Sequence, residues 1–281
     1  MMEELAALDQ IESVEMVNVI DDTFNVPQKR FKEILRQKIK NKFKFKWISN
    51  FRSQYADKEM VQLMKESGCR GVFLGIESGN NQILKNMNKA ANVEKYLDGI
   101  ALLREQNIIT MGSFIIGFPG ENHETVQDTL RFIKESGLDF FRVQLWYCEP
   151  ITPIWQEREK YNLKGESFEW SHNTMDSKTG TRLVDEIFLN IKEPVWVPQY
   201  HFGFDQIWNL TCRGMTIQQV KDFLRAFNSG IKQKLTEPLK QEIDMQVIKQ
   251  LKFSLQQKND KNDSAGEKKE SIDAETVRFN F

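Results

Sequence analysis

Short apolar runs alternate with amphipathic segments over the first 147 residues, and this alternation limits the possible folds more than any other feature. In the amphipathic segments, apolar residues recur every three or four positions and so share one helical face. We expect strands at 14–20, 43–49, 71–77, 108–118 and 139–147. We expect helices at 3–10, 28–40, 57–66, 92–106 and 122–136. Such alternation favours an α/β fold with a parallel sheet covered by helices.

Polar and glycine-rich residues gather where the expected strands end. These segments are DDT, ESG, GFPGEN and CEP. Ligands of parallel α/β folds bind at the carboxyl ends of the strands. The sequence therefore predicts a binding site along this edge of the sheet.

The character of the chain changes after about residue 148. Residues 150–215 are rich in tryptophan and proline, and helices are expected only at 176–191 and 216–235. Residues 256–271 contain almost no apolar side chains, which is typical of disorder. We expect three parts: a barrel-like part at 1–155, a helical and aromatic extension at 156–252, and a disordered tail at 253–281.

Charge and composition argue against several classes of partner. Lys and Arg number 39 and Asp and Glu number 40, so the formal net charge of −1 favours neither nucleic acid nor a membrane surface. No apolar run approaches the ~20 residues that span a bilayer. The first residues lack the basic and apolar regions of a secretory signal. Three dispersed cysteines form no zinc or disulfide pattern, which predicts reduced thiols, a cytoplasmic location and no metal site.

Three motifs have both a functional and a structural interpretation. The pair Asp21-Asp22 could hold a cationic ligand group or cap a turn and a helix. Glu77 could bind an ammonium or a ribose hydroxyl, or could be a solvated loop acid. The segment 112–122 has glycines where a ligand could come close, but it also fits a tight strand-to-helix turn. It has neither the GK[ST] element of a P-loop nor a GxGxxG pattern.

Five segments in this order resemble the radical S-adenosylmethionine (SAM) superfamily. They are IDDTFN, WISNFRSQ, GVFLGIESG, GSFIIGFPGEN and EPITPIW. The resemblance covers about residues 3–155 and is closest to the cobalamin-dependent branch, including the P-methyltransferase-like enzymes of natural-product clusters. FEWSHNTMDS and WVPQYHFGF resemble the C-terminal part of the same group. The resemblance implies a partial (β/α)6 TIM-like barrel of parallel strands, with SAM across their carboxyl ends.

The resemblance assigns roles to residues after two strands. Asp21, Asp22 and Thr23 match the motif after the second strand of the family, which contacts the amino group of the methionine part of SAM. Glu77 and Ser78 match the motif of the fourth strand, near the ribose and the methionine part.

Further assignments follow along the next strands. Gly112 to Gly117 match the glycine motif of the fifth strand, where the backbone approaches the cofactor. Leu145 and Trp146 match the sixth strand, whose backbone meets the adenine. Arg52 matches a polar position after the third strand, without a defined role.

One family feature is missing from the sequence. The family holds a 4Fe–4S cluster through a Cys-x-x-x-Cys-x-x-Cys loop after its first strand, since thiolates are the ligands of such clusters. Here Cys69, Cys148 and Cys212 are far apart, and none precedes residue 69. We therefore expect a barrel without the family's first strand, an N-terminally truncated chain, and weak or absent radical activity from this chain alone.

Three functions remain open. The first, implied by the resemblance, is SAM-dependent radical chemistry, with methyl transfer to a small or carrier-bound specialised metabolite and cobalamin as a possible methyl carrier. The second is an accessory or relic barrel that docks with a separate cluster-bearing polypeptide through an exposed strand edge. The third is a small-molecule binder or an aldolase-like barrel enzyme without redox chemistry. It ranks last because Lys44 and Lys46 precede the end of their strand.

Overall fold

The computed structural model describes residues 2–198, 202–240 and 242–256. A parallel sheet of six strands runs through it, in the order β1-β2-β3-β4-β5-β9. The strands are β1 (Met16–Val19), β2 (Lys46–Asn50), β3 (Cys69–Glu77), β4 (Ile109–Ile116), β5 (Phe140–Leu145) and β9 (Val195–Trp196). The predicted α/β fold and its five strands are confirmed. The sixth strand, β9, has two residues, too few to leave a pattern in the sequence.

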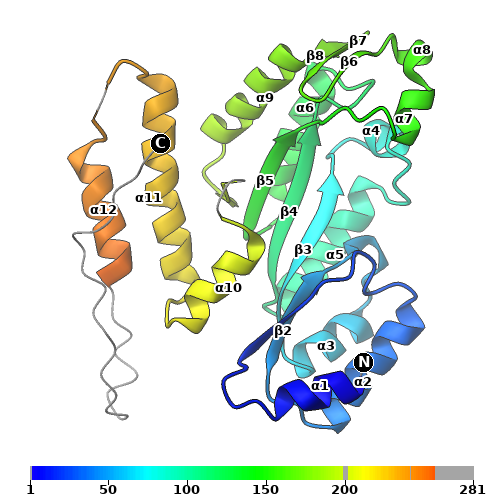
Figure 1. Cartoon of the computed structure of the whole chain (residues 1–281), viewed down its shortest axis with the longest axis vertical. Coiled ribbons are helices and arrows are strands. Elements are labelled where there is room, and N and C mark those ends of the chain that lie inside the picture. Colours follow the sequence, from blue (N-terminus) through cyan, green and yellow to red (C-terminus); the bar gives the residue numbers. More distant parts are fainter. Residues whose placement is uncertain (1, 199–201, 241, 257–281) are drawn as a thin grey trace.

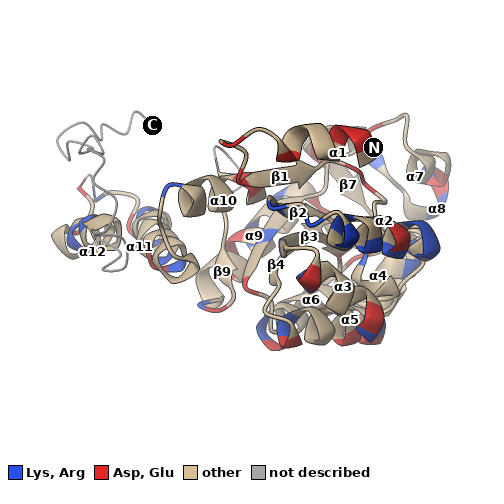
Figure 2. Ribbon diagram, turned by 90° about the horizontal axis from the view of Figure 1, so that it is seen from below, with Lys and Arg blue, Asp and Glu red and all other residues tan. Residues whose placement is uncertain are grey.

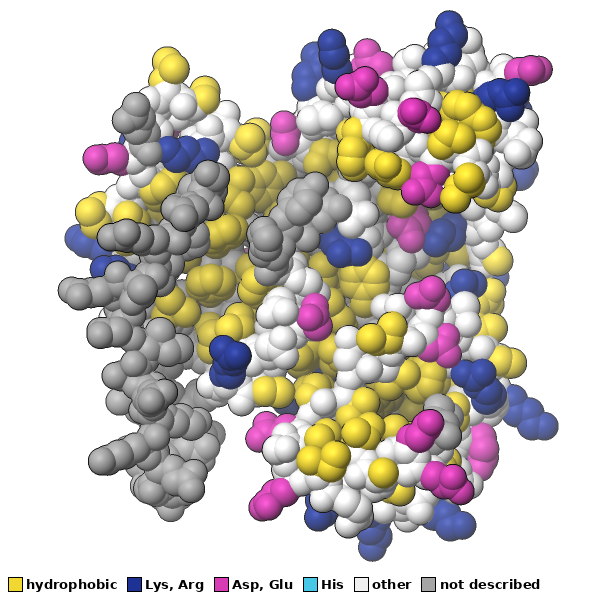
Figure 3. All heavy atoms as spheres, in the orientation of Figure 1, with side chains coloured by type: hydrophobic (Ala, Val, Ile, Leu, Met, Phe, Trp, Pro, Cys, Tyr) yellow, Lys and Arg dark blue, Asp and Glu magenta, His cyan; other side chains and the backbone are white. Residues whose placement is uncertain are grey.

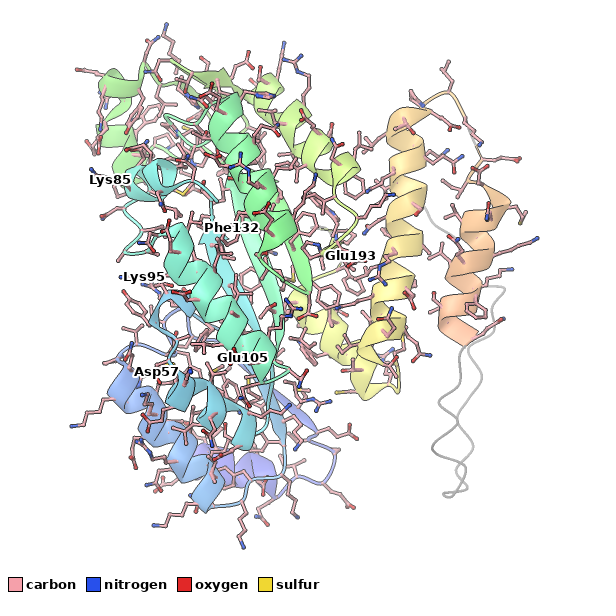
Figure 4. All side chains as sticks on the ribbon, turned by 180° about the vertical axis from the view of Figure 1, so that it is seen from behind. Asp57, Lys85, Lys95, Glu105, Phe132 and Glu193 are labelled. Atoms are coloured by element: carbon pink, nitrogen blue, oxygen red, sulfur yellow. The ribbon has the colours of Figure 1, made fainter. Side chains whose placement is uncertain are left out.

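Helices cover one face of this sheet (Figures 1 and 4). They include α2 (Gln28–Lys40), α3 (Lys58–Glu66), α5 (Val93–Glu105), α6 (His123–Glu135) and α9 (Ser177–Asn190). The sequence sets their starts, because Asp57, Asn92 and Asn122 each accept a hydrogen bond from the backbone of the first helical turn. Basic and acidic residues are interspersed along the helices (Figure 2).

Alternate residues of the strands contact opposite layers, as the pleat of a strand requires. Val72, Leu74 and Ile76 of β3 are buried in the core between the sheet and the helices. On the other face, Met111 and Phe140 belong to a second core under α10 (Phe204–Cys212). These two cores fix which face each strand residue occupies.

The part of the chain after β5 forms short helices, a small second sheet and longer helices. Helices α7 (Pro153–Gln156) and α8 (Arg158–Tyr161) precede an antiparallel sheet of β6 (Lys164–Glu166), β7 (Glu169–His172) and β8 (Met175–Asp176). The last described helices are α11 (Ile217–Thr236) and α12 (Met245–Gln256), beside the sheet in Figure 1. The helices expected at 176–191 and 216–235 are present.

The remaining elements include the helix expected at 3–10, which is present as α1 (Met2–Asp9), and others that differ from expectation or were not predicted. Residues 253–256, expected to begin the disordered tail, form the end of α12, and 257–281 lie outside the described residues. Helix α4 (Asn81–Asn86) and a 3-10 turn at Ser53–Tyr55 complete the described elements. No described helix is long and apolar enough to cross a membrane.

Candidate functional site

Among the described residues, α10 covers one end of the sheet face opposite the helices. Phe73, Met111 and Phe140 lie under α10, and the next residues on the same face are Gly75, Ser113 and Arg142. The strand register places Gly75 beside Ser113, and Ser113 beside Arg142. We call this the open face: Gly75, Ser113 and Arg142, with Asn50, Glu77 and Gln144. In Figure 3 acidic, basic and apolar side chains lie close together on this side of the molecule.

Glu77 ends β3 in a backbone conformation that glutamate rarely adopts. Its φ is +71°, and the pairing with β4 shifts register between Gly75 and Glu77. Its carboxylate lies over Gly75, where a Cβ would be 2.8 Å from Oε1, and it forms an ion pair with Lys89 at 3.0 Å. Strained backbone of this kind gathers at functional sites. The structure places Glu77 on the open face, at the predicted edge.

Asp21 and Asp22 follow β1 and have different surroundings. Asp21 accepts a hydrogen bond from the backbone N–H of Thr23 at 2.8 Å and pairs with Arg30 at 3.3 Å, so it serves the turn before α2. Asp22 accepts a hydrogen bond from the Asn50 side chain at 3.3 Å. Asp22 therefore contacts the open face, and Asp21 matches the structural interpretation.

Arg52 is held through its backbone. Its N–H donates to the Asn25 side chain at 2.9 Å, and its carbonyl accepts from the same side chain at 3.0 Å. Asn25 is fully buried, so this pair of bonds ties the loop after β2 to the start of α2.

The turn after β4 contains a buried carboxyl group that sequence reasoning missed. The backbone N–H of Gly117 donates to Glu121 Oε2 at 2.5 Å, while Glu121 Oε1 has no hydrogen-bond partner among the described residues. Burial raises the pKa of Glu121 to about 8. The available signal was a glutamate four residues after a glycine in a strand-to-helix turn.

The C-terminal part covers this turn. Trp170 lies so close to Gly117 that a Cβ there would be 2.3 Å from its ring. The His172 Nε2 is 3.2 Å from the Gly117 carbonyl, and the Thr174 hydroxyl donates to the Glu121 carbonyl at 2.7 Å. Burial lowers the pKa of His172, in keeping with a structural role. The absence of a side chain at Gly117 therefore makes room for the Trp170 ring.

Other predicted residues are engaged within the protein. The Trp146 N–H donates to the Ile116 carbonyl at 2.7 Å, and its carbonyl accepts from Trp170 Nε1 at 2.9 Å. The side chain of Leu145 packs against Gly180 of α9. The backbone at Trp146, expected near adenine, is thus already hydrogen-bonded.

Gly112 and Ser78 lie on the helical side of the sheet. A Cβ at Gly112 would be 2.7 Å from Leu138. The Ser78 hydroxyl is fully buried and lies 3.3 Å from the Thr129 hydroxyl of α6. Packing accounts for both residues, and the structure places neither on the open face.

The cysteines do not fit a 4Fe–4S cluster. Cys69 begins β3, Cys148 follows β5, and Cys212 ends α10. Within the described ranges, no three His, Cys, Asp or Glu side chains gather where they could hold a metal ion. Burial raises the pKa of Cys69, so it is a thiol and not the thiolate that a cluster needs.

Comparison with known families decides which fold family this sheet represents. The profile described as Radical SAM superfamily matches residues 1–133. Residues 1–133 belong to the radical SAM superfamily. The resemblance is thereby confirmed for the motifs from IDDTFN to GSFIIGFPGEN, which lie within residues 1–133; EPITPIW lies beyond the matched residues.

Curated relatives of this radical SAM domain include methyltransferases. An uncharacterized methyltransferase of Pyrococcus horikoshii is 29% identical over 162 residues, covering 58% of this chain and 35% of the relative. The bacteriochlorophyllide d C-12(1)-methyltransferase of Chlorobaculum tepidum is 30% identical over 185 residues, covering 63% and 40%. The chain thus spans well under half the length of these relatives.

A solved structure shows the same fold. The radical SAM methyltransferase TsrM of Kitasatospora setae, solved with cobalamin and a 4Fe–4S cluster bound, superposes with a TM-score of 0.52 at 21% identity. The superposition covers 57% of this chain and 33% of TsrM.

Proposed function

We propose that this chain supplies the SAM-binding half-barrel of a methyltransferase that acts on a small or carrier-bound metabolite. The observation that carries the proposal is the match of residues 1–133 to the superfamily, together with methyltransferases among the relatives. The cobalamin in TsrM supports cobalamin as the methyl carrier. When bound, these cofactors supply the methyl group and the radical chemistry, and the protein binds and orients.

The open face suits SAM, which carries a sulfonium, an ammonium and ribose hydroxyls. Glu77 and Asp22 provide carboxylates at the ends of β3 and β1, and Asn50 and Ser113 provide hydrogen-bonding groups between them. Glycine at position 75 leaves room for the Glu77 carboxylate, which lies over it on the open face. In the proposal, Asp22 binds the ammonium of SAM and Glu77 binds a ribose hydroxyl.

The chain's residues do not provide the reducing cluster, so we propose that the isolated chain binds SAM without cleaving it. The test is anaerobic reconstitution with iron and sulfide, followed by iron counting and assay of SAM cleavage products. We expect less than stoichiometric iron and no cleavage. A stoichiometric cluster with cleavage by the isolated chain overturns this part of the proposal.

A docking role is the second candidate, and the edge of the sheet favours it. No strand of the described residues pairs with the outer edge of β1. Ile20, just beyond β1, is 86% exposed. An unpaired edge is a template for a strand from another segment. Co-purification with a separate polypeptide that carries the three-cysteine loop supports this role, and a folded monomer that neither binds SAM nor captures that polypeptide indicates a relic.

A further inference from the structure

Arg142 lies on the open face with its side chain held by neighbouring strands. Its Nε donates a hydrogen bond to the Ser113 hydroxyl at 3.3 Å, and its Cζ lies 4.7 Å from the centre of the Phe73 ring. The side chain is half-buried. Stacking on one side and a single hydrogen bond at Nε fix the plane of the guanidinium.

The positive charge of Arg142 has no carboxylate partner among the described residues. Glu77 acts on it electrostatically, but Glu77 forms its ion pair with Lys89 at 3.0 Å. Burial lowers the pKa of Arg142, so the site has lost hydration without gaining an ion pair. Lys89 and Arg142 carry two positive charges and Glu77 carries one negative charge. One net positive charge therefore remains on this part of the open face.

The position of Arg142 separates it from the predicted ammonium site. Asp22 follows β1, whereas Arg142 is on β5, four strand spacings away. At about 4.8 Å per spacing this is about 19 Å along the sheet. In SAM a single carbon joins the amino group and the carboxylate. One SAM molecule therefore cannot place its ammonium at Asp22 and its carboxylate at Arg142.

We propose that Arg142 binds an anionic group of the second substrate, a carboxylate or a phosphate-type oxyanion. This inference rests on the proposed function for the placement of SAM. Arginine presents a planar fork of donors that matches such oxyanions. The stacked guanidinium orients the methyl acceptor on the open face, and so selects acidic metabolites over neutral ones.

The direct test follows the Nε–Hε signal of Arg142 by NMR in the whole chain, with acetate and inorganic phosphate as probes at constant ionic strength. Arg142→Lys identifies the signal, and the exposed Arg131, paired with Asp128 on α6, is the internal reference. We expect a saturable shift at Arg142 with an affinity at least tenfold above that of Arg131. Equal responses of the two arginines, or no response, overturn the proposal.

A second arm separates the two sources of the oxyanion. Calorimetry compares SAM with decarboxylated SAM on the wild type, Arg142→Met and Arg142→Lys, which retains the charge. We expect all three proteins to bind SAM within about twofold of one another. A tenfold loss for SAM alone in Arg142→Met assigns the arginine to SAM and overturns the substrate assignment. Failure of the wild type to bind SAM contradicts the proposed function. The anion titration does not depend on SAM binding and still tests the oxyanion site at Arg142.

Discussion

Glu121 and Gly117 close the turn after β4 through one hydrogen bond, from the Gly117 N–H to Glu121 Oε2 at 2.5 Å. The carboxyl group is fully buried, and its second oxygen has no partner among the described residues. The link therefore stabilises the turn at the cost of burying an ionisable group.

Replacement of Glu121 by glutamine tests this cost through pH. Burial raises the pKa of Glu121 to about 8, so the folded protein binds a proton that the unfolded chain has lost above about pH 4.5. The free energy of unfolding therefore falls as pH rises from about 5 to 8, by up to about 1.4 kcal/mol per pH unit. Urea unfolding across this range should show the slope in the wild type and a smaller slope in Glu121→Gln. Parallel curves for the two proteins would contradict the assignment.

Gly117→Ala should destabilise the fold more than strain alone explains. Gly117 has φ +98°, and a Cβ at this position would lie 2.3 Å from the Trp170 ring. Gly214 has nearly the same φ, +97°, but a Cβ there would meet no atom within 4 Å. We expect Gly214→Ala to cost about 1 kcal/mol and Gly117→Ala about 1–3 kcal/mol more. Equal losses in denaturant unfolding would show that Trp170 adapts.

The strands were predictable because each is a buried, nearly continuous apolar run. The contact between Trp170 and Gly117 was not, because it joins residues far apart in the chain and depends on how β7 packs. Glu77 was found from its place after a strand. Arg142 was missed because its significance depends on the register of β4 and β5, which places Ser113 beside it, and on the lack of a carboxylate partner among the described residues.

Glu77→Gln should weaken SAM binding under the proposed function. The substitution retains the size and removes the charge, and a hydrogen bond to a charged group contributes about 1.5–3 kcal/mol, or about 10- to 100-fold in affinity. Glu94→Gln, at an exposed acid in the first turn of α5, is the matched control and should leave the affinity unchanged. Calorimetry measures both. Equal affinities for the two variants would remove Glu77 from the site.

Hydrogen exchange should reveal the unpaired edge of β1. Amides of this edge strand should exchange orders of magnitude faster than those of β3, which is paired on both sides. A cluster-bearing polypeptide that adds a strand should slow them. Protection along β1 equal to that of β3 in the isolated chain would show that the edge is already covered.

The central claim is that SAM lies on the open face, and hydrogen exchange with and without saturating SAM tests it most directly. We predict that SAM slows exchange at the carboxyl ends of β2, β3 and β4, around Asn50, Glu77 and the turn at Gly117, and leaves the outer surfaces of α2, α3 and α5 unchanged. Protection confined to those helices or to α11 and α12, or no change at saturation, would contradict the claim.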